Sequence, residues 1–225
     1  MSGIIAGAVS AVVVALCTVL ASTRGARWCR GYARMIDDPV PRHTWLVGTV
    51  AQAVLALLAS GAVVGWALAH GAPLEGILAA PVAVVLCQAG SVDAVCHRLP
   101  DVLLASAAGF ALISGGIRLW QQGPSLSALG VWAGAAALVL AITTVLALIG
   151  SGMGLGDVKL MGVAGLWLGP HGLAVPLWSL MGGFLLAGPV ALALIVFRRL
   201  GRKDPMAFGP YLIAGILITW ALGLT

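Results

Sequence analysis

Charged residues are scarce in this chain of 225 residues, because Asp, Glu, Lys and Arg together make up only 8% of it. In soluble globular domains they make up about a quarter, so the composition excludes an ordinary soluble fold. Hydrophobic residues make up 61% and occur in continuous runs. A membrane β-barrel would show short segments of alternating polarity instead. The chain is therefore predicted to be an all-α, polytopic membrane protein.

Cysteine is also rare, with four residues that are isolated from one another and no C-x-x-C pair. A structural zinc site needs closely spaced thiolate or imidazole ligands. We therefore expect no metal site and no other cofactor. Cys17 and Cys87 lie within hydrophobic runs and are interpreted as small buried side chains.

The hydrophobic runs predict one transmembrane domain, residues 1–225, with about eight helices. A helix needs about 20 apolar residues to cross a hydrocarbon core about 30 Å thick. The stretch 158–197 is about twice that length, and we divide it at Gly169-Pro170-His171-Gly172, which is typical of a turn. The first run has no basic residues before it, so we interpret it as an anchor rather than a signal peptide. The predicted spans are 3–23, 44–69, 76–92, 102–117, 128–149, 158–173, 174–197 and 210–224.

Basic residues predict the orientation of these spans. All but Arg118 fall in alternate loops of the eight-span arrangement, including the loop 24–43. The positive-inside rule makes that face cytoplasmic and leaves both termini outside. The membrane topology alone then explains the net charge of +5, so we predict the lipid bilayer as a partner and no nucleic acid. The residues on the predicted cytoplasmic face are Arg24, Arg27, Arg30, Arg34, Arg42, Arg98, Lys159, Arg198, Arg199, Arg202 and Lys203.

Two of the seven acidic residues stand apart from the others. Asp93 and Asp157 each adjoin the end of an apolar span, where an aspartate within the hydrocarbon costs about 2.5 to 3.5 kcal/mol. Two crossings separate them, so both lie at the same face and at similar depth. Asp37 and Asp38 belong to the basic loop and are interpreted as solvated charges rather than substrate contacts.

If Asp93 and Asp157 meet, they form a catalytic pair. Two neighbouring carboxylates in a partly desolvated site share one proton near neutral pH. One can then act as the base that activates water, while the other acts as the acid that polarises a peptide carbonyl. A proton- or cation-coupled transporter using the two residues as a relay is the alternative, although such relays usually lie near the midplane.

A glycine-rich run precedes Asp157. Gly150, Gly152, Gly154 and Gly156 would fray a helix and permit close approach of another chain. An extended peptide substrate needs that access. The alternative is that these glycines serve helix packing, as they often do in membranes.

Three segments resemble known protease motifs. Gly154-Leu155-Gly156-Asp157 is similar to the G-x-G-D signature of intramembrane aspartyl proteases. Asp93 followed by Leu99-Pro100-Asp101 resembles the first-aspartate motif of type IV prepilin peptidases, and Phe208-Gly209-Pro210-Tyr211-Leu212-Ile213-Ala214-Gly215 resembles a motif near the last helix of that family. The resemblance covers roughly residues 80–216.

This resemblance implies an aspartic endopeptidase of the inner (plasma) membrane. It would remove the basic leader of prepilins or pseudopilins after a glycine, at the cytoplasmic face. Asp93 and Asp157 would be the catalytic residues. Lys159 would stabilise this pair, or would only be a lysine expected at a cytoplasmic helix end. The other residues expected to support the site are Pro100, Gly154, Gly156, Gly209 and Pro210.

Some features distinguish this chain from related proteases. Bifunctional family members carry a cytoplasmic insert with two C-x-x-C pairs, whereas the loop 24–43 has only Cys29. We therefore expect peptidase activity without N-methyltransferase activity. A presenilin-like protease would carry a Pro-Ala-Leu motif near its C-terminal helices, and none is present. An inactive assembly factor stays open as an alternative.

Overall fold

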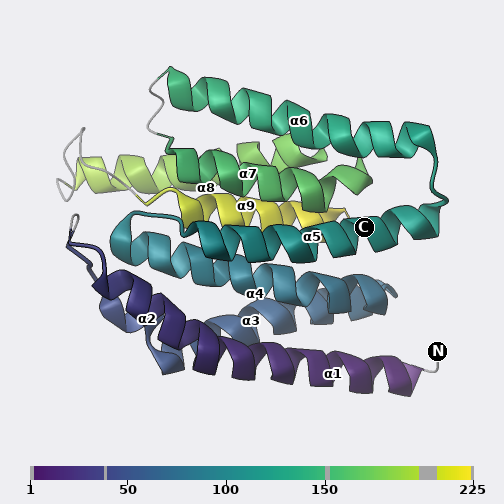
Figure 1. Ribbon diagram of the computed structural model, residues 1–225, viewed down its shortest axis with the longest axis horizontal. Coiled ribbons are helices and arrows are strands. Elements are labelled where there is room, and N and C mark those ends of the chain that lie inside the picture. The colour runs from purple at the N-terminus through teal and green to yellow at the C-terminus, as the bar shows by residue number, and fades with distance from the viewer. Residues whose placement is uncertain (1–2, 38–39, 150–152, 198–206, 224–225) are drawn as a thin grey trace.

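The computed structural model describes residues 3–37, 40–149, 153–197 and 207–223. These residues form helices joined by short connections, and none of them lies in a β-strand (Figure 1). The elements are α1 (Gly3–Leu20), η1 (Ala21–Gly25), α2 (Ala26–Arg34), η2 (Thr44–Val47), α3 (Thr49–Ala69), α4 (Pro73–Cys96), α5 (Asp101–Gln122), α6 (Leu126–Leu148), α7 (Leu155–Leu168), η3 (Gly169–His171), α8 (Val175–Val196) and α9 (Gly209–Leu222). Residues of the sequence analysis that lie outside the described ranges are Asp38, Gly150, Gly152, Arg198, Arg199, Arg202 and Lys203.

The predicted all-helical membrane bundle is confirmed. Since α1, η1 and α2 form one continuous run, Gly3–Arg34, the described residues contain eight long helical runs. Six helices are long and apolar enough to cross a membrane, whereas α7 and α9 have 14 residues each. A 14-residue helix is only about 21 Å long, shorter than the hydrocarbon core. The turn expected at residues 169–172 does separate α7 from α8.

The prediction of a basic loop over residues 24–43 is wrong for its first part. The helix continues through a π-helical turn at η1 and then through α2. Apolar residues on one side of α2, including the buried Cys29 and Ala33, give it an amphipathic pattern that allows a helix to extend beyond the apolar span. The Gln88 side chain of α4 packs tightly against Gly25 at the π-helical turn. Such turns are commonly found where a side chain interrupts the regular helical ladder.

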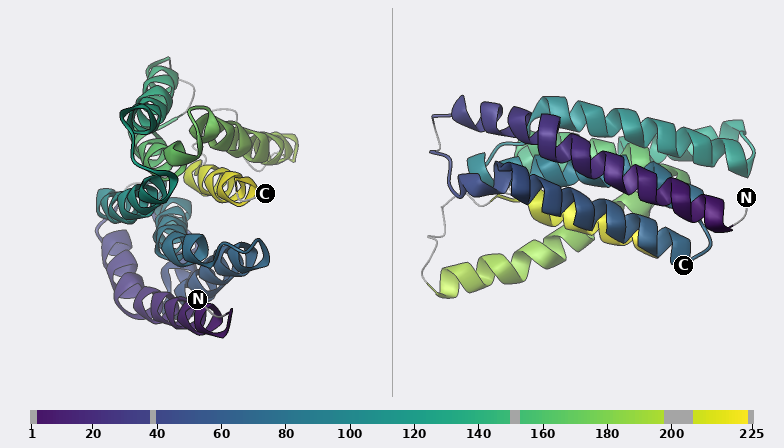
Figure 2. Two further views of the ribbon diagram at one scale, coloured as in Figure 1. Left: turned by 90° about the vertical axis from the view of Figure 1, so that its right-hand side faces the viewer. Right: turned by 90° about the horizontal axis from the view of Figure 1, so that it is seen from below.

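Four helices form the centre of the bundle. Helices α4, α5, α7 and α9 contact one another in a ring, as the end-on view in Figure 2 shows. Helices α1 and α3 pack on the α4 side, and α6 and α8 pack on the α7 and α9 side. The start of α1 and the end of α9 lie at the same end of the bundle (Figure 1).

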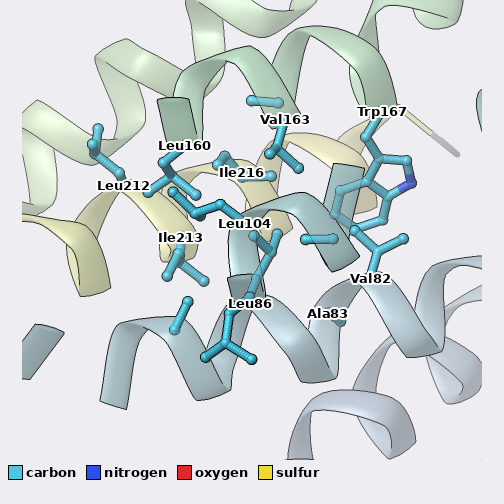
Figure 3. Close-up of a cluster of buried hydrophobic side chains, with 14 of the residues drawn as sticks. Val82, Ala83, Leu86, Leu104, Leu160, Val163, Trp167, Leu212, Ile213 and Ile216 are labelled. Carbon is cyan, nitrogen blue, oxygen red and sulfur yellow. The ribbon is translucent and has the colours of Figure 1, made fainter. Parts of the chain in front are cut away.

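The interior of this ring is apolar. Leu86 of α4, Leu104 of α5, Leu160 of α7 and Ile216 of α9 meet there (Figure 3). Trp167 of α7 lies at one end of the same cluster. These side chains come from all four helices. Their packing therefore fixes the end of α4, which carries Asp93, relative to the start of α7, which carries Asp157.

Helices α8 and α9 approach each other through glycine. A Cβ atom placed on Gly215 would lie 2.6 Å from the backbone nitrogen of Gly183 and still closer to the Ser179 carbonyl oxygen. Rigid backbone atoms cannot move aside as a flexible side chain can. The two helices can therefore pack this closely only if position 215 is glycine.

The Gly215→Ala variant is expected to be destabilised by about 1 to 3 kcal/mol, the usual cost of overpacking a well-packed core. Thermal unfolding of the purified protein in detergent, followed by tryptophan fluorescence, would measure the loss. Gly188→Ala on α8 is the matched control, because a Cβ there meets no heavy atom within 4 Å. Equal melting temperatures for the two variants would contradict the proposed close packing.

Candidate active site

Asp93 lies in the last turn of α4 and is 6% exposed. A carboxylate at the C-terminal end of its own helix is disfavoured by the helix dipole. The structure offsets this through another helix, because the backbone N–H of Gly209 donates a hydrogen bond of 2.9 Å to Asp93 Oδ2. Gly209 is the first residue of α9, so the positive end of that helix faces the Asp93 carboxylate.

Asp157 lies in the first turn of α7 and is 7% exposed. Its Oδ2 accepts a hydrogen bond of 3.0 Å from the backbone N–H of Gly154, the N-cap residue. This contact satisfies one of the unpaired donors at the start of the helix. An acidic side chain that pairs with the N-cap backbone can do so while exposed to solvent. This contact therefore does not by itself account for the burial of Asp157.

The structure brings the two carboxylates together. Asp93 and Asp157 lie close enough to interact electrostatically, although 63 residues separate them in the chain. Leu99 packs against Gly156 and Gly209, which neighbour these carboxylates. A Cβ on Gly156 would lie 3.1 Å from Leu99 Cβ, and a Cβ on Gly209 would lie 3.2 Å from Leu99 Cδ2. Glycine at these two positions therefore leaves room for Leu99 between α7 and α9.

A short turn places Leu99 there. His97 ends α4 with a positive φ of 52°, and its N–H donates to the Asp93 carbonyl at 2.7 Å. Such angles are uncommon for residues other than glycine. Pro100 then serves as the N-cap position of α5, as expected for a residue that ends the loop just before a helix.

Lys159 does not pair with either buried carboxylate among the described contacts. Its Nζ binds Asp101 Oδ1 at 2.7 Å, which links α7 to the start of α5. Both side chains are largely exposed, so this ion pair contributes at most about 1 kcal/mol. Asp101 is the first residue of α5, and its carboxylate lies in the first turn of that helix.

A cavity of about 640 Å³ opens at the same end of the bundle, lined by residues that neighbour Asp93 and Asp157 in the chain but not by these two residues themselves. We call it the cleft. The turn His97–Asp101 forms one wall and the start of α7 forms another. The third wall comes from α2, where the rings of Trp28 and Tyr32 stack with their centroids 5.3 Å apart. The lining residues are Trp28, Tyr32, His97, Arg98, Leu99, Pro100, Asp101, Val102, Gly154, Leu155, Gly156 and Lys159.

The volume of the cleft is typical of small-molecule sites, and Gly154 and Gly156 are among the residues that line it. In the part of the chain that the structure describes, no group of three or more His, Cys, Asp or Glu residues is placed to hold a metal.

Comparison with known proteins agrees with this geometry. The sequence profile of the type IV leader peptidase family matches residues 80–197, just over half of the chain. This chain belongs to that family. It is also 41% identical over 78 residues to the prepilin leader peptidase/N-methyltransferase of Aeromonas hydrophila. That match covers 33% of this chain and 25% of the Aeromonas protein. No solved structure matches the chain.

Asp93 and Asp157 lie inside the residues that the family profile matches, whereas other parts of the site lie outside them. Gly209, which donates to Asp93, lies beyond its end, and Trp28 and Tyr32 lie before its start. Pro210 follows Gly209 in the first turn of α9, where proline is well tolerated because its missing N–H is not needed.

Sequence reasoning missed the contribution of α2 to the cleft. Trp28 and Tyr32 are four residues apart, which places them on one face of a helix. This spacing could have indicated a shared aromatic face. It does so only if residues 26–34 are helical rather than a loop. The packing role of Leu99 between the two glycines was likewise absent from the motif match.

Proposed function

We propose that this protein is an aspartic endopeptidase that removes the leader of prepilins or pseudopilins. Membership of the type IV leader peptidase family supports this function. The observation that carries it is the pairing of Asp93 and Asp157, two buried carboxylates from separate helices, beside an open cleft. Burying two carboxylates close together costs free energy, and buried acidic residues of this kind are typical of functional sites.

The proposed chemistry uses the two carboxylates as one unit. Because like charges in a desolvated site cannot both persist, the pair holds one proton. The ionised member takes a proton from water as the water attacks the scissile carbonyl, and the protonated member donates a hydrogen bond to the carbonyl oxygen. Each Oδ2 is held by a backbone N–H, from Gly209 or Gly154, so the other oxygen of each carboxyl group can be directed to water and substrate.

We propose that the end of the bundle carrying Asp93 faces the cytoplasm. Arg42 is tied to this end by its backbone N–H, which donates to the Val95 carbonyl at 3.0 Å. Basic residues gather here, on the α1–α2 run, in the α4–α5 turn and at the start of α7. The positive-inside rule then gives a multi-pass protein of the inner membrane, with the start of α1 and the end of α9 outside.

This orientation suits the proposed substrate. The basic leader of a prepilin stays on the cytoplasmic side, while its apolar segment lies among the helices. Cleavage after the leader glycine then occurs at the membrane face, next to the cleft. We propose no nucleic-acid partner and no cofactor.

We further propose that the protein has no N-methyltransferase activity, although the name of the Aeromonas protein includes it. The segment between the first two crossings is short, and the nine residues of α2 take up part of it. Its one cysteine, Cys29, is buried in the hydrophobic core.

Co-expression with a candidate prepilin tests the function. The pilin N-terminus is identified by mass spectrometry in cells that carry the wild-type protein or an empty vector. We expect cleavage after the leader glycine, without added methyl mass, only when the protein is present. Intact precursor across several pilin partners would contradict the proposal and favour the transporter or the inactive assembly factor.

The aromatic wall of the cleft is expected to contribute to substrate binding. Replacing Trp28 by Ala removes one ring of the stacked pair. An aromatic contact of that ring with a substrate side chain would be worth about 0.5 to 1.5 kcal/mol. KM for a synthetic prepilin peptide should rise about 3- to 10-fold while kcat changes little. Trp120→Ala is the matched control, since Trp120 is exposed near the end of α5 and does not line the cleft. An unchanged KM for Trp28→Ala would show that the substrate does not use this wall.

A further inference from the structure

Helix α2 also lines a second cavity, with the face opposite to the cleft. Arg30 and Arg34 lie on the side away from Trp28 and Tyr32, where they line a separate cavity of about 400 Å³. We call it the basic cavity. Thr44 contributes a hydroxyl group, and the apolar walls include Ala33, Ile36 and Val47. None of these residues belongs to the cleft beside Asp93 and Asp157.

The positive charge of the basic cavity is not neutralised within the described residues. Two guanidinium groups line it and no carboxylate does, and neither Arg30 nor Arg34 takes part in a described ion pair. Arg30 Nη1 donates a hydrogen bond of 2.8 Å to Thr49 Oγ1. This bond orients the guanidinium group and leaves its other N–H donors available, in a geometry that suits phosphate oxygens.

The surroundings of the basic cavity point to a membrane lipid. The segment 44–49 joins it to an apolar hollow at the start of α3, lined in part by Trp45, Val50 and Val54. All three side chains are exposed, and tryptophan in such a position is typical of the membrane interface. A charged recess and an adjoining apolar groove match the two parts of a phospholipid.

We propose that Arg30, Arg34 and Thr44 bind the phosphate of an anionic phospholipid whose acyl chain lies along Trp45, Val50 and Val54. Two cations without a neighbouring anion discriminate against zwitterionic lipids, whose ammonium group they repel. The bound lipid holds α2 from the side opposite the cleft, so it supports the helix that carries Trp28 and Tyr32. The proposal does not depend on peptidase activity.

Lipid binding to the purified, detergent-solubilised full chain tests this site. Native mass spectrometry and thermal unfolding are recorded during titration with phosphatidylglycerol or phosphatidylcholine. For the wild type we expect at least tenfold tighter binding of phosphatidylglycerol. The double variant Arg30→Gln/Arg34→Gln should lose that preference. The double variant Arg24→Gln/Arg27→Gln is the matched control, because it removes the same charge from the same helical run outside the cavity, and it should keep the preference.

Three outcomes would overturn the proposal. They are equal binding of the two lipids by the wild type, retained preference in Arg30→Gln/Arg34→Gln, and an equal loss in the control. A third arm uses inorganic phosphate. If phosphate alone reproduces the thermal shift and displaces phosphatidylglycerol at equal concentration, the site binds free phosphate rather than lipid.

A second pair of variants keeps the test decisive if the double Gln variant fails to fold. Arg30→Lys/Arg34→Lys retains the charge but loses the forked guanidinium geometry, and Thr44→Val removes one hydroxyl group. Each should weaken phosphatidylglycerol binding several-fold. Wild-type affinity in both would contradict the assigned contacts.

Discussion

Cleavage of a prepilin is expected to stop when either Asp93 or Asp157 is replaced by Asn. An amide cannot accept the proton from water, and it cannot share a proton with the remaining carboxyl group. A positioned general base contributes about 100- to 10,000-fold, so we expect a loss of kcat of at least about 1,000-fold when the pair is broken. The measurement is the rate of conversion of a synthetic prepilin peptide by purified protein, with the mass of the product as the readout.

Asparagine is a suitable replacement because it preserves most of the local structure. Its side-chain oxygen can still accept the hydrogen bonds that Gly154 and Gly209 donate to these positions. Membrane levels and melting temperatures should therefore stay near those of the wild type. Asp37→Asn is the control, because Asp37 is exposed and lines neither the cleft nor the basic cavity. Near-normal cleavage by either Asp93→Asn or Asp157→Asn would exclude the two-carboxylate mechanism.

A single methyl group at position 209 is expected to reduce activity by at least tenfold. A Cβ on Gly209 would lie 2.7 Å from Asp93 Oδ2, so either the carboxylate or the start of α9 must move. Tenfold corresponds to about 1.4 kcal/mol in the activation free energy. Because Gly209 positions Asp93 without touching the substrate, the loss should appear in kcat while KM stays within about threefold.

The pH dependence separates this positioning role from simple destabilisation. Moving Asp93 changes its hydrogen bond and its distance from Asp157, so the pH profile of kcat/KM should shift in Gly209→Ala. A partly unfolded enzyme would lose amplitude at every pH without a shift. Gly109→Ala on α5 is the control, since a Cβ there meets no heavy atom within 4 Å. An unshifted profile with a lowered melting temperature would assign Gly209 to packing alone.

Much of the fold could be predicted from the composition and from a few short sequence motifs. Long apolar runs can be satisfied in a bilayer only by helices that pair their own backbone groups, so the all-helical bundle was predictable. The Gly169–Gly172 turn was also predictable, because glycine and proline there interrupt an apolar stretch too long for one crossing. The family resemblance is confirmed by the family match over residues 80–197, which include Asp93 and Asp157 but end before the F-G-P segment.

The error over residues 24–43 has a physical explanation. Arginines after an apolar span indicate a membrane boundary, but they do not indicate where a helix ends. Arginine is a good helix former, and an amphipathic helix can continue past the membrane surface when one face is buried. The burial of Cys29 and Ala33 depends on contacts with distant parts of the chain, which no local pattern contains.

The sequence by itself determined the class of the protein, its family and the identity of the two buried aspartates, because these depend on composition and on motifs within short segments. Only the tertiary structure decided that α9 supplies a donor to Asp93, that Leu99 fits between two glycines, and that α2 separates the cleft from the basic cavity. The first of these contacts joins residues that are 116 positions apart in the chain. The order of helices around a bundle results from the packing of all of them, and a hydrophobic pattern records only that each helix is buried or faces lipid.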